Sequence, residues 1–197
     1  MAKRLFDLVF GGLLFVFLAP LFLVISLLIK LDSKGPIFFI QGRLGQNGKV
    51  FKMIKFRTMV PNAERMGTGL FSYSDDPRIT RVGKYLRMTS LDEIPQIINV
   101  LLGNMSLVGP RPPVTYELGE YKDFTDTMKI RFRVKPGITG LAQVSGRNDL
   151  EWNQKIFFDN IYVEKFERYG IFEDILLLIK TLFVVLFMKN IIEKKPE

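Results

Sequence analysis

The chain has 197 residues, 48% of them hydrophobic, which is enough for one domain with a packed core and excludes general disorder. Its 28 Lys and Arg against 20 Asp and Glu give a net charge of +8, which favours an anionic partner but does not distinguish nucleotides, lipid headgroups and nucleic acids. The chain has no histidine and no cysteine, so its chemistry must use carboxylates, amines, hydroxyls or an oxygen-ligated metal.

The first predicted element is a membrane segment. No residue from Leu8 to Ile29 is charged, and as a helix this run spans about 33 Å, enough to cross a bilayer. A signal peptide fits less well, because the run is long and lacks a small-x-small cleavage site. Pro20 should kink the helix, and basic residues such as Lys3 and Lys30 flank both ends, so the positive-inside rule places both ends on the cytoplasmic side. We therefore favour, for residues 1–34, a helix–break–helix that enters one leaflet and returns over a bent helix that crosses.

Residues 37–59 predict a β-hairpin, with two apolar-rich runs joined by a turn at Asn47-Gly48. The GQNGK stretch is not a P-loop, because Lys49 is followed by valine rather than by Ser or Thr. Residues 60–77 are polar and rich in Gly, Ser and Asp, which is typical of a lid or binding loop.

Helices dominate the remainder. Residues 78–88 predict an amphipathic helix that turns a row of basic side chains outward, and both a headgroup-facing surface and a ligand site explain that row: Arg78, Arg81, Lys84 and Arg87. Residues 90–104 predict a core-facing helix through Ile94, Ile97, Ile98, Leu101 and Leu102. Further helices are expected over 116–135 and from a cap at Asn148 or Asp149 through Tyr162.

The last apolar stretch, residues 171–190, is interrupted by Lys180 and Lys189, so it is too short to span a bilayer. We expect it to lie at the membrane interface or to pack on the domain. The fold class that follows is α+β and predominantly helical, with a small β-hairpin and amphipathic interfacial helices.

Two adjacent acids stand out in TSLDEIPQ. Ser90 and Glu93 match the S-x-x-E capping box, and Asp92 would complement the helix dipole, so helix capping explains both acids without catalysis. A helix N-terminus with arginines upstream also attracts phosphate. A carboxylate in that corner suits attack on phosphorus or binding of Mg²⁺. The residues alone leave both interpretations open.

Two further stretches suit ligand contacts. In SLVGPRPP, Arg111 lies between Pro110 and Pro112, and a stiff backbone would preorganise its guanidinium for phosphate, although an ordinary proline-rich turn explains it as well. The glycines of KPGITGLAQVSGRN around Arg147 indicate tight turns or a close approach to a ligand.

Four blocks in order resemble the monotopic phosphoglycosyl transferases, the bacterial sugar transferase family. They are KFRTM at 55–59, DPRITRVGKYLRMTSLDEIPQ at 76–96, NVLLGNMSLVGPRP ending at 112, and KPGITGLAQVSGRN at 135–148. With the membrane segment, the resemblance covers nearly the whole chain.

The resemblance implies an enzyme of the bacterial inner membrane, with a re-entrant helix hairpin and an active site that faces the cytoplasm. Such enzymes transfer a sugar phosphate from a UDP-sugar to a polyprenyl phosphate, normally undecaprenyl phosphate, with Mg²⁺, and release UMP. Some members carry extra membrane helices and a second domain; here we expect the small form, with residues 35–197 as the catalytic domain at the membrane.

The resemblance also assigns residues. Asp92 is implied as the nucleophile and Mg²⁺ ligand, and Glu93 as its partner in the catalytic dyad. Substrate contacts are implied first at Arg87 and at Arg111 with its neighbours Pro110 and Pro112, and then at Lys55, Arg57, Arg147 and Asp159.

Two other functions are compatible with parts of the chain. A non-catalytic membrane scaffold would use the basic surface for anionic lipid, but it gains nothing from two adjacent acids. Nucleic acid is not expected as a partner, because no recognition motif is present and the apolar segment would be unexplained. No residue pattern selects among UDP-sugars or indicates an oligomeric state.

Overall fold

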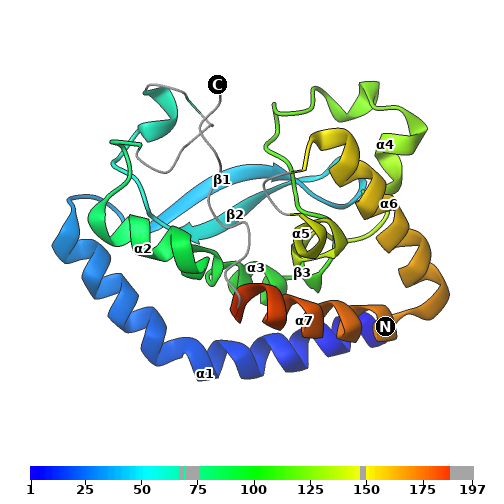
Figure 1. Ribbon diagram of the computed structural model, residues 1–197, viewed down its shortest axis with the longest axis horizontal. Helices are drawn as coiled ribbons and strands as arrows, with labels where there is room; N and C mark the ends of the chain where they lie inside the picture. Colours follow the sequence, from blue (N-terminus) through cyan, green and yellow to red (C-terminus); the bar gives the residue numbers. More distant parts are fainter. Residues whose placement is uncertain (67–68, 70–75, 147–149, 187–197) are drawn as a thin grey trace.

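The computed structural model describes residues 1–66, 69, 76–146 and 150–186. It confirms a predominantly helical α+β architecture, with two small sheets (Figure 1). The longer elements are α1 (Ala2–Asp32), β1 (Phe38–Leu44), β2 (Val50–Phe56), α2 (Arg81–Thr89), α3 (Gln96–Leu102), β3 (Ser106–Val108), α4 (Asp126–Ile130), β4 (Gly137–Thr139), α5 (Leu141–Ser145), α6 (Trp152–Tyr169) and α7 (Ile171–Leu186). Arg147 and the cap expected at Asn148 or Asp149 lie outside the described residues; the cap observed for α6 is Glu151.

The first helix differs from its prediction. α1 is one continuous helix of 31 residues that contains Pro20, so the expected break is wrong. A proline removes a single backbone donor and pushes on the preceding turn, which bends a helix but leaves the neighbouring hydrogen bonds able to carry it on. Figure 1 shows α1 curving beneath the rest of the molecule.

The N-terminal arm of α1 is attached to the domain by polar contacts. Arg4 donates to the carbonyl of Leu101 at 2.8 Å, which satisfies an open carbonyl at the end of α3. Asp7 is buried and accepts hydrogen bonds from the Ser106 hydroxyl at 2.9 Å and the Leu107 amide at 3.0 Å. A charged side chain inside an apolar helix is thereby paired with the start of β3.

The C-terminal arm of α1 is attached mainly by apolar packing. Ile25 and Ile29 are buried in one cluster with Phe56 of β2 and Leu86 of α2. The last residue of the helix, Asp32, accepts a hydrogen bond from the Val82 amide at 3.0 Å in the first turn of α2. Both ends of α1 therefore contact the same domain.

The predicted hairpin is confirmed. β1 and β2 pair antiparallel, with Phe38 opposite Phe56 and Leu44 opposite Val50. Asn47 and Gly48 adopt φ values of 55° and 73°, the left-handed conformation that Asn and Gly tolerate best.

The α3 helix lies along β2 and is held there by a buried asparagine. Asn99 Oδ1 accepts from the Ile54 amide at 2.9 Å, and its Nδ2 donates to the Lys52 carbonyl at 2.7 Å. The predicted core face was partly wrong, because Asn99 is buried and Leu102 is 67% exposed. The backbone amide of Ile54 and the backbone carbonyl of Lys52 in β2 need polar partners, so α3 is oriented with Asn99 toward this strand.

Residues 116–135 do not form the single helix that was predicted. The chain instead makes a short 3₁₀ turn at Tyr121–Asp123 and then the five-residue α4. Gly119 has a φ of 90°, and Phe124 is extended and buried against Phe132. Burial of these aromatic side chains outweighed a helix propensity that is weak by itself.

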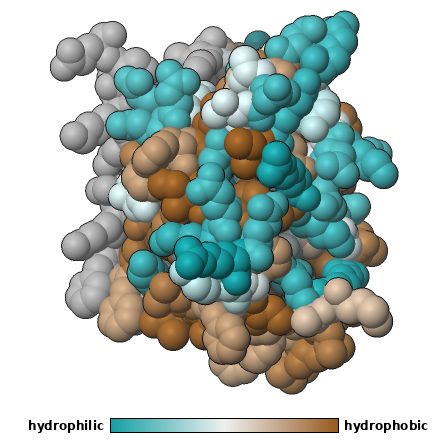
Figure 2. Space-filling model, turned by 90° about the vertical axis from the view of Figure 1, so that its right-hand side faces the viewer, coloured by the Kyte–Doolittle hydropathy of each residue, from teal (hydrophilic) through white to brown (hydrophobic). Residues whose placement is uncertain are grey.

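The two apolar helices share one side of the molecule. α7 lies alongside α1 in Figure 1, buries Leu177 in the core and leaves Phe172 and Leu182 exposed by 80% and 65%. Of the two placements expected for the C-terminal stretch, packing on the domain is observed, while a position at the membrane interface stays a prediction. Figure 2 shows the result as hydrophobic surface along the lower edge and hydrophilic surface above it.

The polar contact between α3 and β2 can be tested by mutation. We expect Asn99→Ala to lower the free energy of unfolding by about 2 kcal/mol, because it leaves a buried amide and a buried carbonyl unpaired. Thermal unfolding in detergent measures the change, and Leu102→Ala on the exposed face of the same helix serves as the control. Equal melting temperatures for the two variants would contradict the assigned role of Asn99.

Candidate active site

The two adjacent acids lie on a single-turn 3₁₀ helix, η3 (Leu91–Glu93), between α2 and α3. Ser90 reverses the chain with a φ of 57° and makes no side-chain cap to η3. The capping box that would have explained Glu93 is therefore absent, because that carboxylate is bound elsewhere.

Glu93 is held by two cations from other parts of the chain. Lys55 of β2 lies 2.7 Å from Glu93 Oε1. Arg111, which follows β3, donates to Oε1 at 2.8 Å and to Oε2 at 3.2 Å, so it binds the carboxylate with two nitrogens. Both carboxylate oxygens are thus occupied.

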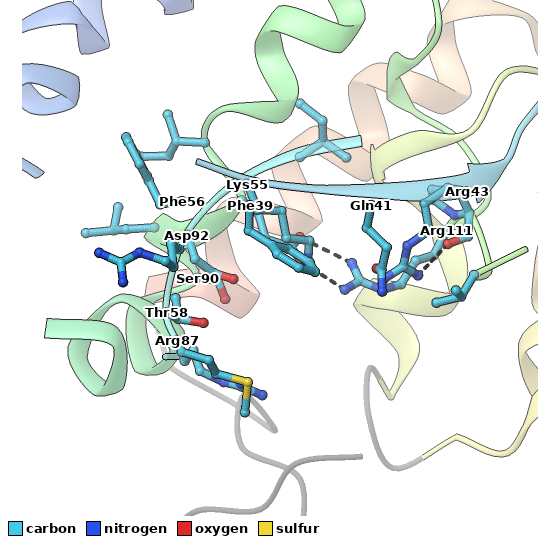
Figure 3. Close-up of a pocket in the computed structure, with 18 of the residues that line it drawn as sticks. Phe39, Gln41, Arg43, Lys55, Phe56, Thr58, Arg87, Ser90, Asp92 and Arg111 are labelled. Carbon is cyan, nitrogen blue, oxygen red and sulfur yellow. Dashed lines mark hydrogen bonds and ion pairs between the residues drawn. The ribbon is translucent and has the colours of Figure 1, made fainter. Parts of the chain in front are cut away.

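Asp92 lies next to this cluster but is not part of it. Within the described ranges, no side chain or backbone amide makes a hydrogen bond or ion pair with its carboxylate, which is partly exposed in the cleft. Figure 3 shows Asp92 in the cleft with Lys55, Arg87 and Arg111. One carboxylate is fixed and its neighbour is available for a ligand.

The environments of the two acids shift their pKa values in opposite directions. Burial favours the neutral form of Glu93, but Arg111 and Lys55 outweigh it and hold the pKa of Glu93 well below its usual range. Burial, together with the negative charge of Glu93, raises the pKa of Asp92 to about 6, against the opposing effect of Lys55. Burial also lowers the pKa of Lys55. Asp92 is consequently the more basic carboxylate of the pair.

Hydrogen bonds fix the backbone at Arg111 and at Pro112. Pro110 and Pro112 are buried, and the carbonyls of Arg111 and Pro112 accept hydrogen bonds from Arg131 at 2.6 Å and Arg43 at 3.0 Å. Gly109 comes just before, where a Cβ would lie only 2.3 Å from the Lys135 carbonyl, so the close approach of β3 and β4 requires glycine.

Two arginines of the basic row that precedes the acids, Arg87 and Arg78, have different environments. Arg87 lines the cleft from the last turn of α2 and helps to offset the raised pKa of Asp92. Arg78 was predicted to face outward but is only 5% exposed. It pairs with Asp76 at 2.6 Å and donates to the carbonyl of Ala63 at 2.8 Å, so it organises the loop before α2.

Arg57 is used by the backbone at the end of α1. Its guanidinium donates to the carbonyls of Ser33, Lys34 and Pro36 at 2.9, 2.8 and 2.6 Å, and the residue is 4% exposed. The contacts observed for this predicted substrate residue join β2 to the segment that follows α1.

Asp159 lies at another end of the same cleft, on α6. It forms an ion pair of 2.7 Å with Arg131, and each side chain is 1% exposed. Burial raises the pKa of Asp159 to about 6. Arg131 was not predicted from the sequence, where it appears only as one of several bases in KIRFRVK.

These residues line one cleft of about 1180 Å³. Apolar side chains of α1, Leu14 and Leu18, lie at its border, the dyad and its cations contribute to its polar wall, and Gln143 and Trp152 also line it. A volume of this size admits a ligand larger than most single cofactors.

A metal would find a limited set of ligands here. The described residues contain no group of three or more acidic side chains that could enclose an ion. Mg²⁺ commonly binds proteins through one or two carboxylates and takes its other ligands from phosphate and water. The available carboxylate of Asp92 fits that mode.

Comparisons with known proteins match this chain to sugar transferases. A family model described as bacterial sugar transferase matches residues 1–188. The undecaprenyl-phosphate galactose phosphotransferase of Salmonella typhimurium is 41% identical over 93% of this chain and 40% of its own length. The UDP-glucose:undecaprenyl-phosphate glucose-1-phosphate transferase of Klebsiella pneumoniae is 40% identical over 92% of this chain and 39% of its own length.

A shorter relative covers more of its own length. The exopolysaccharide production protein ExoY of Sinorhizobium fredii is 39% identical over 92% of this chain and 84% of the relative. The chain thus spans about 40% of the two phosphotransferases and most of ExoY.

Because the negative charge of Glu93 raises the pKa of Asp92, a neutral residue in place of Glu93 should shift that pKa. We expect Glu93→Gln to lower the pKa of Asp92 from about 6 toward its ordinary value near 4, because a negative neighbour is lost while Lys55 and Arg111 remain. Titration of ¹³C-labelled aspartate carboxyls by NMR measures it. Glu120→Gln, at an exposed site, is the control, and an unchanged midpoint for Asp92 would contradict the assigned coupling.

Proposed function

The chain belongs to the bacterial sugar transferase family, and from this premise we propose that it transfers a sugar-1-phosphate from a UDP-sugar to a polyprenyl phosphate and releases UMP. The reaction proceeds through a covalent phosphosugar intermediate on Asp92. The acceptor is undecaprenyl phosphate, the lipid that appears in the names of two relatives described above. The step would begin the assembly of a bacterial glycoconjugate on its lipid carrier.

One observation carries the mechanism: Asp92 is available while Glu93 is held. The Glu93 carboxylate has both oxygens bound by Lys55 and Arg111, whereas the Asp92 carboxylate has no partner within the described ranges and is the more basic of the two. A nucleophile needs a lone pair that is not engaged in a hydrogen bond. Glu93 accepts three hydrogen bonds from Lys55 and Arg111, whereas Asp92 accepts none from the described residues.

The first half-reaction forms the intermediate. An oxygen of Asp92 attacks the β-phosphorus of the donor, a bond forms between that oxygen and phosphorus, and the bond from phosphorus to the bridging oxygen breaks. The electron pair leaves with UMP. Arg87 and Arg111 line the cleft and would bind the diphosphate, which reduces the repulsion between the attacking anion and the phosphate oxygens.

The second half-reaction releases the sugar phosphate to the lipid. An oxygen of the polyprenyl phosphate attacks the same phosphorus, the bond from phosphorus to Asp92 breaks, and the carboxylate is regenerated. The product is a polyprenyl diphosphate sugar. Apolar side chains of α1, Leu14 and Leu18, border the cleft and would face the lipid end of the acceptor.

Glu93 acts as a positioning residue in this scheme. It fixes the orientation of Arg111, and its charge adds to the effect of burial in raising the pKa of Asp92. Asp92 would also hold Mg²⁺, which when bound neutralises part of the diphosphate charge.

We further propose that α1 is re-entrant and lies in the cytoplasmic leaflet of the inner membrane, with the cleft open to the cytoplasm. It is long and apolar enough to cross, with only 11% of its most apolar window buried. Both of its ends contact one domain, whereas a crossing helix would place its ends on opposite sides. The exposed middle, with Val16 and Phe17 exposed by 72% and 80%, suits lipid tails.

The nucleophile can be tested directly. We expect Asp92→Asn to lower UMP release by at least about a thousandfold, because the amide cannot attack phosphorus. The assay uses purified protein in nanodiscs with Mg²⁺, undecaprenyl phosphate and a panel of UDP-sugars, and wild type serves as the reference. Without the acceptor, mass spectrometry should find a phosphosugar on Asp92 of the wild type alone.

Each result of that assay has a definite meaning. UMP from the wild type alone supports sugar-phosphate transfer, and the preferred donor is identified at the same time. Release of UDP would mean that only the sugar is transferred, and an active Asp92→Asn variant would remove Asp92 from the mechanism. No nucleotide from any donor, together with binding to anionic vesicles, would favour the membrane scaffold.

The pKa of Asp92 sets the pH dependence. Attack requires the ionised carboxylate, so kcat/KM should fall as the pH drops through about 6 and level off above it. The measurement is a pH profile of UMP release at subsaturating donor. A profile that stays flat down to pH near 4, where an ordinary aspartate titrates, would contradict the raised pKa.

A further inference from the structure

One wall of the cleft holds buried polar atoms that the proposed mechanism does not use. It consists of Gln143 on α5, Arg131, and Trp152 and Asp159 on α6, and all four line the cleft. Arg131 and Asp159 are 2% and 1% exposed. We call this set the α5–α6 wall.

The α5–α6 wall has hydrogen-bonding capacity left over. Within the described part of the chain, neither amide atom of Gln143 has a hydrogen-bond partner, and the same is true of Nε and Nη1 of Arg131. Asp159 lies 2.7 Å from Arg131 Nη2, but neither of its carboxylate oxygens has a well-directed hydrogen bond. Buried polar groups are nearly always satisfied, and a cluster of exceptions on a cleft indicates a ligand.

The composition of the wall selects the class of ligand. Arg131 and Asp159 form an ion pair, and a buried carboxylate repels phosphate, so a second anion is disfavoured next to Asp159. Lys155, whose ammonium lies 5.0 Å from the centre of the Trp152 ring, adds one cation to the same part of the cleft. Donors and acceptors side by side, with the ring of Trp152 next to them, suit a neutral ring that carries several hydroxyl or imide groups. The Arg131 guanidinium lies 5.2 Å from the centre of the Trp152 ring.

The wall is connected to the site of reaction. Arg131 Nη2 donates to the backbone carbonyl of Arg111 at 2.6 Å, and the Arg111 side chain in turn binds Glu93. A donor with its diphosphate at Asp92 and Arg111 would therefore have one of its ring systems near the wall.

We propose that the α5–α6 wall binds a neutral hydroxylated ring of the nucleotide-sugar donor and that Gln143 is one of the residues that bind this ring. The inference rests on the proposed function. The hexose and the uridine of the donor share the required chemistry, so the experiment separates them.

Gln143→Leu is the informative variant. Its two polar atoms make no hydrogen bond to the described residues, so the change removes none of the described hydrogen bonds and should leave the melting temperature unchanged. We expect KM for the preferred UDP-sugar to rise about three- to tenfold, with kcat near the wild-type value, as for loss of ground-state hydrogen bonds. Ser145→Ala, an exposed position on the same helix that does not line the cleft, is the matched control.

Inhibition by UMP identifies the ring. If Gln143→Leu raises KM for the donor but leaves the inhibition constant of UMP unchanged, the wall binds the hexose, and the preference among UDP-sugars should change as well. If both constants rise together, the wall binds the uridine. Either result supports the inference.

The contrary outcomes are distinct. An active wild type beside a Gln143→Leu variant with unchanged KM and unchanged UMP inhibition would overturn the role of the wall and leave the proposed function intact. A lower melting temperature with unchanged KM would make Gln143 structural and overturn it too. A wild type that releases no UMP would overturn the proposed function and this inference with it.

Discussion

The ion-pair cluster at Glu93 is the constraint on which the candidate site depends. Lys55, Glu93 and Arg111 come from β2, from the turn before α3 and from the segment after β3, and their contacts of 2.7 and 2.8 Å bring these three parts of the chain together. A partly buried carboxylate with two cations is stable only when all partners are present, because removal of one leaves an unpaired charge. The cluster therefore shapes the cleft as well as its electrostatics.

In the proposed mechanism, the same cluster helps an anion to attack an anionic substrate. Burial, together with the negative charge of Glu93, raises the pKa of Asp92, and Arg87 and Arg111 line the same cleft, where the proposal has them bind phosphate. Two carboxylates that are neighbours in the chain thus have different environments. The chain has no histidine, the side chain that usually titrates near neutral pH. Asp92, with a pKa raised to about 6, titrates in that range instead.

The structure and position of α1 depend both on local sequence signals and on tertiary contacts. The apolar run from Leu8 to Ile29 and the hairpin turn at Asn47-Gly48 are local features: the run forms a helix, although an uninterrupted one, and the hairpin appears as predicted. Pro20, where a kink was expected, does not interrupt the helix, since the loss of one hydrogen bond can bend a helix without ending it. The hydrogen bonds of Asp7 and Arg4 to residues about 100 positions away have no local signature at all.

For the site, the sequence by itself determined which kinds of groups were available and where: two adjacent acids, an arginine between prolines, and bases upstream. It could not separate a capping box from a catalytic pair, because Ser90 and Glu93 satisfy the capping pattern by spacing alone. Only the tertiary structure decided that Glu93 binds Lys55 and Arg111, that Arg78 and Arg57 serve the backbone, and that Arg131 meets Asp159. The physical reason is that hydrogen bonds and ion pairs depend on distances of about 3 Å in space, and residue spacing sets those distances only within one element.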